Sequence, residues 1–355
     1  MKTICDMEPS LAATFVKGFH DEAIVSKMKF NRFGRTDLVV SEISLGAGTL
    51  SKLYGNLGET EGIKAVHLAL KSGINYIDTA PWYGQGRSEE ILGLALKNVP
   101  RQSYYLATKV GRYELEYEKM FDYSAKKTRE SVEKSLNLLG LNCLDVVQIH
   151  DVEFAPNLDV IINETLPALE KLKAEGKLRY IGVSAYPIDV LKDLISRAPG
   201  RFDSVLCYCR NSLIDDTLKQ FMPFFEANKL AVVCAAGHGM GLLTNAGPQW
   251  WHPAPEQTKA VCKEASTYCQ ENDVELGKLA MYHFIQMKGP ATFLCGMQRE
   301  SLVALNLDAF YNGLNDKERN GLEYLNKNVF VKIECAHWEG IEVQKYWDEM
   351  KKAKS

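Results

Sequence analysis

Eight short apolar stretches alternate along the chain with stretches in which apolar residues recur every three or four positions. Most of the short stretches are continuously apolar, which is typical of strands buried on both faces of a parallel sheet. They are residues 42–48, 74–78, 104–110, 144–150, 179–185, 202–209, 230–236 and 291–297. The intervening stretches, such as 60–73 with its terminal Gly73, have the spacing of amphipathic helices.

Eight strand–helix units in succession predict an α/β fold of one kind, the parallel (β/α)8 or TIM barrel. A doubly wound sheet is the alternative, but no GxGxxG sequence opens the first predicted helix. We expect the barrel to occupy residues 42–312. Residues 1–41 form an N-terminal extension and a β-hairpin, with its turn at Gly34, that plugs the barrel bottom. Residues 313–355 add a C-terminal helix and a tail over the barrel mouth.

Composition and charge narrow the range of functions. The 355 residues include 42 Lys and Arg against 45 Asp and Glu, a balance that gives no basic surface for nucleic acid. Nine scattered cysteines, an odd number without a CxxC pair, predict buried free thiols in a reducing compartment and no metal site. The sequence shows no signal peptide and no apolar run long enough to span a membrane, so we expect a cytoplasmic protein.

Candidate catalytic residues stand where consecutive predicted strands end. Asp78 closes the second strand and Tyr83 follows it; Lys109 lies at the end of the third strand and His150 at the end of the fourth. Taken singly, these residues fit a turn cap, a loop aromatic, a solvated strand end and a core histidine. Because active sites of such barrels form at the C-terminal ends of the strands, the four together predict a catalytic group.

The types of these residues indicate proton transfer coupled to hydride transfer. A tyrosine has an ordinary pKa of about 10, and a neighbouring ammonium held by a carboxylate is expected to lower it. Lys109 and Asp78 would play those parts beside Tyr83. Tyr83 would then donate a proton to a carbonyl oxygen, or accept one from an alcohol, while hydride moves at carbon. His150 would donate a hydrogen bond to the same oxygen.

The motifs that carry these residues resemble those of the aldo-keto reductases. They are "GINYIDTAPWYGQGRSEEILG", "ATKVGR" and "LDVVQIHD", and the resemblance covers roughly residues 28–312. Two further motifs, "GMGLLTNAGPQWWHPAP" and "GVSAYP", are most similar to the L-galactose dehydrogenase-like branch of the family. The resemblance implies that Asp78, Tyr83, Lys109 and His150 form the catalytic tetrad. It also implies a nicotinamide dinucleotide bound extended, without a Rossmann fold.

The resemblance further implies which positions contact the cofactor. Near the nicotinamide these are Gly48, Thr49, Asp78, Ser184 and Cys207, the last in place of a usual glutamine. Near the pyrophosphate they are Ala236, Gly237, His238 and Met240, and near the adenosine Gly296, Gln298, Arg299 and Asn306. Ala235 stands where many members have an aromatic residue stacked on the nicotinamide.

The choice of cofactor stays open between NADP and NAD. Arg299 is the one cation at the adenosine end that is placed to bind a 2′-phosphate. The family at large favours NADP(H), which is our first expectation, and the branch favours NAD(H).

Aromatic residues predict the class of substrate. Trp82, Trp250, Trp251 and Trp338 are placed to wall the mouth, which favours a neutral sugar, aldehyde or ketone over a phosphorylated compound. The alternative is that the long loops pack on the barrel rim. We therefore expect an NAD(P)-dependent oxidoreductase that interconverts a small carbonyl compound and an alcohol. Its rivals are a lyase or aldolase with a Schiff base at Lys109, and a non-catalytic nicotinamide-binding sensor or partner-binding protein of the same fold.

Overall fold

A computed structural model of the chain describes residues 12–55 and 58–353. Eight parallel strands form a closed barrel in the order β10-β3-β4-β5-β6-β7-β8-β9, which confirms the predicted (β/α)8 fold. Each strand ends within two residues of its predicted bounds, the usual uncertainty at element ends. The strands are β3 (Ile43–Gly46), β4 (Tyr76–Asp78), β5 (Tyr105–Val110), β6 (Leu144–Ile149), β7 (Leu178–Ala185), β8 (Ser204–Tyr208), β9 (Ala231–Ala235) and β10 (Thr292–Gly296).

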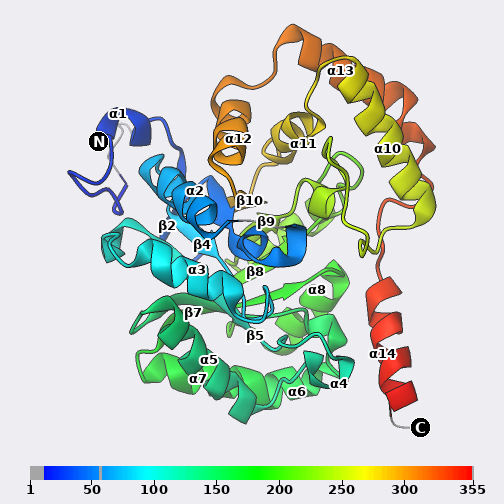
Figure 1. The fold of residues 1–355 in the computed structure, drawn as a ribbon. Helices are drawn as coiled ribbons and strands as arrows, with labels where there is room; N and C mark the ends of the chain where they lie inside the picture. The colour runs from blue at the N-terminus through cyan, green and yellow to red at the C-terminus, as the bar shows by residue number, and fades with distance from the viewer. Residues whose placement is uncertain (1–11, 56–57, 354–355) are drawn as a thin grey trace, which may run out of the picture.

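Helices surround the barrel and bury their apolar faces against the outward side chains of the strands (Figure 1). The ring consists of α2 (Glu59–Lys71), α3 (Arg87–Leu96), α5 (Ala125–Leu139), α7 (Leu166–Ala174), α8 (Ile188–Arg197), α9 (Leu218–Ala227), α11 (Leu276–Phe284) and α12 (Glu300–Asn312). Shorter or additional helices are α1 (Glu22–Val25), α4 (Tyr117–Met120), α6 (Leu158–Val160) and α10 (Glu256–Glu271). The predicted helix at 60–73 ends at Lys71, and Gly73 follows at a φ of 91°.

The predicted N-terminal hairpin closes the bottom of the barrel. Its strands β1 (Phe30–Arg32) and β2 (Val39–Ser41) are antiparallel. Phe33, Leu38 and Val40 are fully buried in one cluster with inward-facing barrel residues such as Tyr76. Gly34 turns the hairpin at a φ of +57°, and a Cβ there would lie 2.5 Å from the backbone nitrogen of Ala231. The turn thus needs glycine for both its conformation and its close approach to β9.

The C-terminal region contains two helices, α13 (Asp316–Asn328) and α14 (Ile341–Ala353), where the sequence analysis expected one. Helix α14 lies beside α4 at the edge of the barrel mouth (Figure 1). Whether residues 1–41 and 313–355 are units separate from the barrel stays a prediction. Within residues 12–55 and 58–353 there is no helix of the length and apolarity that a membrane crossing requires.

Candidate active site

The strand ends bring the four predicted catalytic side chains together. Lys109, in β5, donates from Nζ to Asp78 Oδ1, to the carbonyl of Thr79 at 2.9 Å and to the Tyr83 hydroxyl at 3.3 Å. His150 directly follows β6, and its ring meets the ring of Tyr83 edge-on at 5.9 Å between centroids. Lys109 and Asp78 are each only 1% exposed. The phenol, the ammonium, the carboxylate and the imidazole therefore share one buried site.

A fifth residue, Gln148, belongs to this group and was missed by the sequence analysis. Its Nε2 donates to Asp78 Oδ2 at 2.5 Å, so both carboxylate oxygens of Asp78 accept a hydrogen bond. Gln148 is a fully buried amide in the mainly apolar strand β6, two residues before His150. Side chains two apart on a strand point to the same face, and that spacing was the available signal.

The ion pair keeps its charges despite burial. Burial opposes the charged form of Lys109, but the negative charge of Asp78 and the hydrogen bonds around it hold the lysine pKa above its ordinary value. Burial likewise raises the pKa of Asp78, and the Lys109 ammonium and Gln148 act against that rise. Each partner thus stabilises the ionised form of the other.

Lys109 acts on the pKa of Tyr83 in the predicted direction, but the pKa as a whole is raised and not lowered. Burial raises the pKa of Tyr83, and the nearby Lys109 ammonium reduces that rise without reversing it. Tyr83 is therefore a protonated phenol at neutral pH, suited to donate a proton. Burial also lowers the pKa of His150 to about 3, so its imidazole is neutral. Nδ1 of His150 is buried without a hydrogen-bond partner in the described chain.

Next to the tetrad lies an ion pair that the sequence analysis did not anticipate. Arg112 donates to Asp151 Oδ2 at 2.8 Å and stacks its guanidinium 4.1 Å from the ring centre of Trp82. Asp151 directly follows His150, at a φ of +50° that is uncommon for a residue other than glycine. Arg112 thus contacts both Trp82, a predicted substrate residue, and Asp151, the residue next to His150.

Glycines leave room at the predicted nicotinamide end. A Cβ on Gly48 would lie 3.4 Å from the ring of Tyr83, and one on Gly296 would lie 2.5 Å from Cγ2 of Thr49. Gly48 is thus close to the phenol of Tyr83, and Gly296, predicted for the adenosine end, lies against Thr49. Ser184 is buried, and its hydroxyl accepts a hydrogen bond from the Asp151 N–H at 3.2 Å.

Cys207 is not placed as predicted. Along β8, Leu206 and Tyr208 belong to the inner cluster of the barrel, whereas Cys207 packs in the outer layer with the helices. Alternation along a strand therefore points its thiol away from the mouth. Burial, together with the nearby Cys234, also raises its pKa. The inward position next to Cys207 is Leu206, so a side-chain contact of Cys207 with a ligand in the mouth is ruled out by geometry.

The loop after β9 can contact a dinucleotide through its backbone rather than through its side chains. Ala236 and Met240 have positive φ values of 59° and 52°, and a Cβ on Gly237 would lie 2.2 Å from the ring of Phe284. Nε2 of His238 forms a hydrogen bond with the carbonyl of Gly277 at 3.0 Å, so this side chain holds the loop in place. Burial lowers the pKa of His238. Tightly turned backbone of this kind fits a pyrophosphate. The open space at Gly48 beside Tyr83, together with this loop, fits a nicotinamide dinucleotide.

The predicted adenosine end is exposed. Arg299 is the N-cap residue of α12, and its Nε donates to Glu61 of α2 at 2.9 Å; both side chains are 46% exposed. Gln298 is partly buried, and Asn306 is buried in α12. The cation expected to bind a 2′-phosphate is thus already paired with a carboxylate.

The two predicted substrate tryptophans in the loop after β9, Trp250 and Trp251, differ in their contacts and in their exposure. Trp251 donates from Nε1 to the carbonyl of Leu53 at 3.3 Å and meets the ring of Tyr54 edge-on. Trp250 is 91% exposed and its side chain faces solvent. The structure therefore packs Trp251 against the segment after β3 and does not bring Trp250 to the tetrad.

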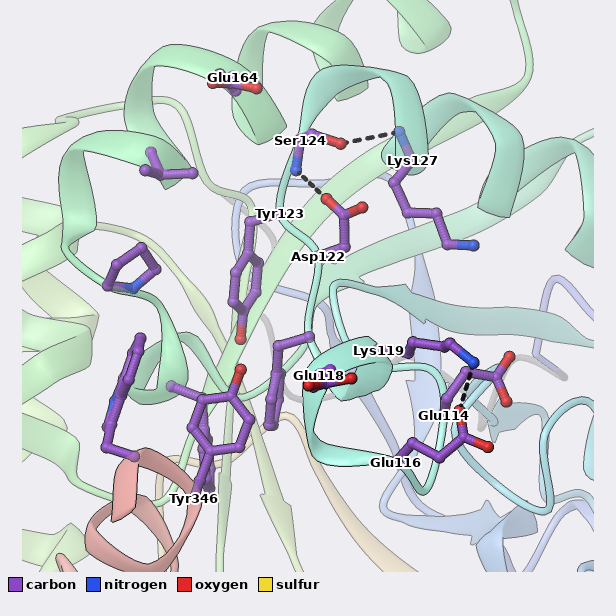
Figure 2. A pocket seen from close by; sticks show the side chains of 15 residues that line it. Glu114, Glu116, Glu118, Lys119, Asp122, Tyr123, Ser124, Lys127, Glu164 and Tyr346 are labelled. Carbon is purple, nitrogen blue, oxygen red and sulfur yellow. Dashed lines mark hydrogen bonds and ion pairs between the residues drawn. The ribbon is translucent and has the colours of Figure 1, made fainter. Parts of the chain in front are cut away.

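A separate cavity of about 730 Å³ lies outside the tetrad, between the loop after β5, the segment after β6 and α14 (Figure 2). Aromatic residues such as Tyr123, Phe154 and Tyr346 line one side, and acidic residues such as Glu116 line the other. No tetrad residue lines it. In the part of the chain that the structure describes, no three metal-ligating side chains converge.

Comparison with known proteins agrees with this geometry. The sequence pattern of the Aldo/keto reductase family matches residues 42–327. The chain is 38% identical over 288 residues to the L-galactose dehydrogenase of Arabidopsis thaliana, covering 80% of this chain and 89% of that protein. It is 34% identical over 319 residues to the D-arabinose 1-dehydrogenase of Saccharomyces cerevisiae, covering 84% and 93%. An aldo-keto reductase of Bacillus halodurans, solved in its holo form, superposes with a TM-score of 0.65 at 30% identity, covering 84% and 96%.

The fold and these similarities define an oxidoreductase with a nicotinamide cofactor. The chain belongs to the aldo/keto reductase family, as the resemblance predicted.

Proposed function

We propose that the protein interconverts an aldose and its C1-oxidised lactone by hydride transfer, with Tyr83 as the general acid and base. The hydrogen bond from Lys109, itself held by Asp78, to the partly buried Tyr83 hydroxyl carries this proposal. The names of the two relatives, an L-galactose dehydrogenase and a D-arabinose 1-dehydrogenase, support an aldose as the substrate.

The chain's own residues would hold the reacting oxygen and move its proton. The neutral imidazole of His150 donates a hydrogen bond to the C1 oxygen and fixes its position beside the Tyr83 hydroxyl. During oxidation the ionised form of Tyr83 accepts the C1 hydroxyl proton while the C1 hydrogen leaves as hydride, and during reduction the protonated form of Tyr83 donates that proton to the carbonyl oxygen. The dinucleotide supplies the hydride acceptor or donor. Because burial raises the pKa of Tyr83, oxidation should accelerate as pH rises above neutrality.

For the cofactor we retain both dinucleotides, with NADP(H) as the first expectation from the family at large. Arg299 is paired with Glu61 and is therefore less available to bind the 2′-phosphate of NADP(H). This pairing favours NAD(H). A cytoplasmic location likewise stays a prediction, supported by eight described cysteines that are all free thiols.

The Tyr83→Phe variant tests the proposal directly. It removes only the hydroxyl, so the dinucleotide should bind as in the wild type while aldose oxidation falls by a factor of roughly 10³ or more. Dinucleotide binding is measured by fluorescence titration and turnover from nicotinamide absorbance. Turnover equal to that of the wild type would remove the phenol from the mechanism.

The same assays separate the rival functions. A protein that binds dinucleotide but turns over neither aldoses nor aldehydes would be the non-catalytic sensor. Borohydride trapping of a substrate on Lys109 would indicate the Schiff-base lyase instead. The position of Lys109, enclosed between Asp78 and Tyr83 and kept as an ammonium, disfavours that nucleophile.

A further inference from the structure

The segment from Trp338 to Trp347, here called the tail segment, is attached at two sites on the barrel mouth. At its first attachment Trp338 stacks on Tyr186 at 5.0 Å and meets His252 edge-on at 4.9 Å. The next residue, Glu339, pairs with the buried Arg210 that follows β8. The beginning of the tail segment is therefore fixed over the ends of β7 and β8.

The second attachment lies over the loops after β5 and β6. Tyr346 of α14 is buried between Phe121, at 5.1 Å, and Phe154, at 5.7 Å (Figure 2). The same two rings flank the guanidinium of Arg112, at 5.3 and 5.6 Å. Arg112 belongs to the ion pair beside His150, so this attachment adjoins the active site.

Glu342 lies between the two attachments. It precedes Tyr346 by four residues on α14 and so lies on the same side of the helix, one turn nearer the helix start. Its side chain is partly buried, and it forms no hydrogen bond or ion pair with any described residue. A carboxylate held over the mouth by two aromatic attachments is thus left without a protein partner.

The mutual effects of Arg112 and Glu342 on their pKa values agree with a position of Glu342 near Arg112. Burial opposes the charge of Arg112, but the carboxylates of Asp151 and Glu342 hold the pKa of its guanidinium above the ordinary value. Burial raises the pKa of Glu342, and Arg112 acts against that rise. Arg112 also has a buried Nε without a hydrogen-bond partner in the described chain. One buried donor on Arg112 and the carboxylate of Glu342 are therefore without a hydrogen-bond partner among the described residues.

We propose that Glu342, together with Arg112, determines substrate specificity by binding hydroxyl groups of a neutral sugar at a distance from its reacting carbon. This inference rests on the proposed function and extends it to residues beyond 327, where the family match ends. Carboxylate–hydroxyl hydrogen bonds are the usual means by which proteins hold sugars against water, and an unpaired acceptor strongly rejects a substrate that lacks the hydroxyl.

The charge of Glu342 also selects against anionic substrates. Glu342 and Asp151 both place a carboxylate near the guanidinium of Arg112, so the positive charge of Arg112 is already compensated. A sugar that carries a carboxylate or phosphate at its far end would be repelled there. The tail segment would thus favour aldoses over uronic acids and sugar phosphates.

The Glu342→Gln variant, assayed as the holoenzyme, tests the proposal with three substrates. For an aldose such as D-arabinose or L-galactose, kcat/KM should fall roughly ten- to a hundred-fold, mainly through KM, because the charged carboxylate acceptor is replaced by a neutral amide. For a short aldehyde without distal hydroxyls the loss should be about two-fold or less. For a uronic acid, kcat/KM should rise relative to the aldose. Glu349→Gln is the matched control, since it removes the same charge on the same flank of α14 two turns further along.

Binding of a polyol inhibitor to the holoenzyme, measured by calorimetry, tests the inference apart from turnover. A polyol has no carbonyl, so weaker binding to Glu342→Gln than to Glu349→Gln supports the inference even if no aldose is turned over. Absence of wild-type turnover would count against the proposed function alone. Equal losses for aldose and short aldehyde, or unchanged polyol binding, would overturn the role of Glu342.

Discussion

Two ion pairs at opposite ends of the proposed cofactor site differ mainly in burial. At the catalytic end Lys109 and Asp78 are 1% exposed, and each makes further hydrogen bonds to Thr79, Tyr83 or Gln148. At the adenosine end Arg299 and Glu61 are 46% exposed. Charges in a low-dielectric interior interact strongly and are costly to separate, whereas exposed pairs are screened by water and salt. We therefore expect substitutions in the Lys109–Asp78 pair to have large effects and substitutions in the Arg299–Glu61 pair to have small ones.

Removing one partner from each pair should give very different losses of stability. Lys109→Met leaves the Asp78 carboxylate buried and uncompensated, which typically costs ~3–5 kcal/mol in the free energy of unfolding. Glu61→Gln removes an exposed pair and should cost about 1 kcal/mol or less. Urea unfolding of both variants measures the difference. Losses of similar size would show that burial does not separate the two ends.

The same Lys109→Met variant should lose nearly all turnover. Without the ammonium, burial and the charges of Asp78 and Asp151 raise the pKa of Tyr83 further, and the phenol becomes a still weaker acid. Glu61→Gln, in contrast, should keep wild-type kcat at saturating dinucleotide.

The catalytic end should also respond to acid. The pKa of His150 is lowered to about 3 from an ordinary 6.5. Between these two values the unfolded chain binds a proton at this histidine and the folded chain does not. Stability from this histidine is full above pH 6.5 and is lost as pH falls toward the lowered pKa, by up to ~1.4 kcal/mol per pH unit. His150→Asn should therefore flatten the dependence of unfolding free energy on pH between 6.5 and 4. Arg299→Ala, at the other end, should leave that slope unchanged.

Much of the fold and the tetrad could be predicted from local patterns. Apolar runs located all eight strands, because strands covered on both faces are mainly apolar. The tetrad followed from the rule that strand ends converge. Cys207 was misplaced by one position, since a one-residue shift in a strand reverses the facing of a side chain and an apolar run does not reveal its register.

Other features depend on long-range contacts that local patterns do not reveal. The pKa of Tyr83 results from burial by the whole mouth, against which one ammonium is insufficient. Helix α14 was missed although Val343, Tyr346, Trp347 and Met350 have helical spacing, and its role follows only from its packing beside α4. The pairing of Arg299 with Glu61 joins residues 238 positions apart in the sequence.

The smallest expected effect is at the adenosine end. If the 2′-phosphate of NADP binds Arg299, it must compete with Glu61, and an exposed pair of this kind is worth up to about 1 kcal/mol, a factor of roughly five or less in affinity. Glu61→Gln should therefore tighten NADP by roughly two- to five-fold and leave NAD unchanged. Arg299→Ala should weaken NADP and hardly change NAD. Fluorescence titration of both dinucleotides measures these ratios at low and at high salt, where screening should shrink the effect. Equal changes for NADP and NAD in both variants would place the phosphate away from Arg299.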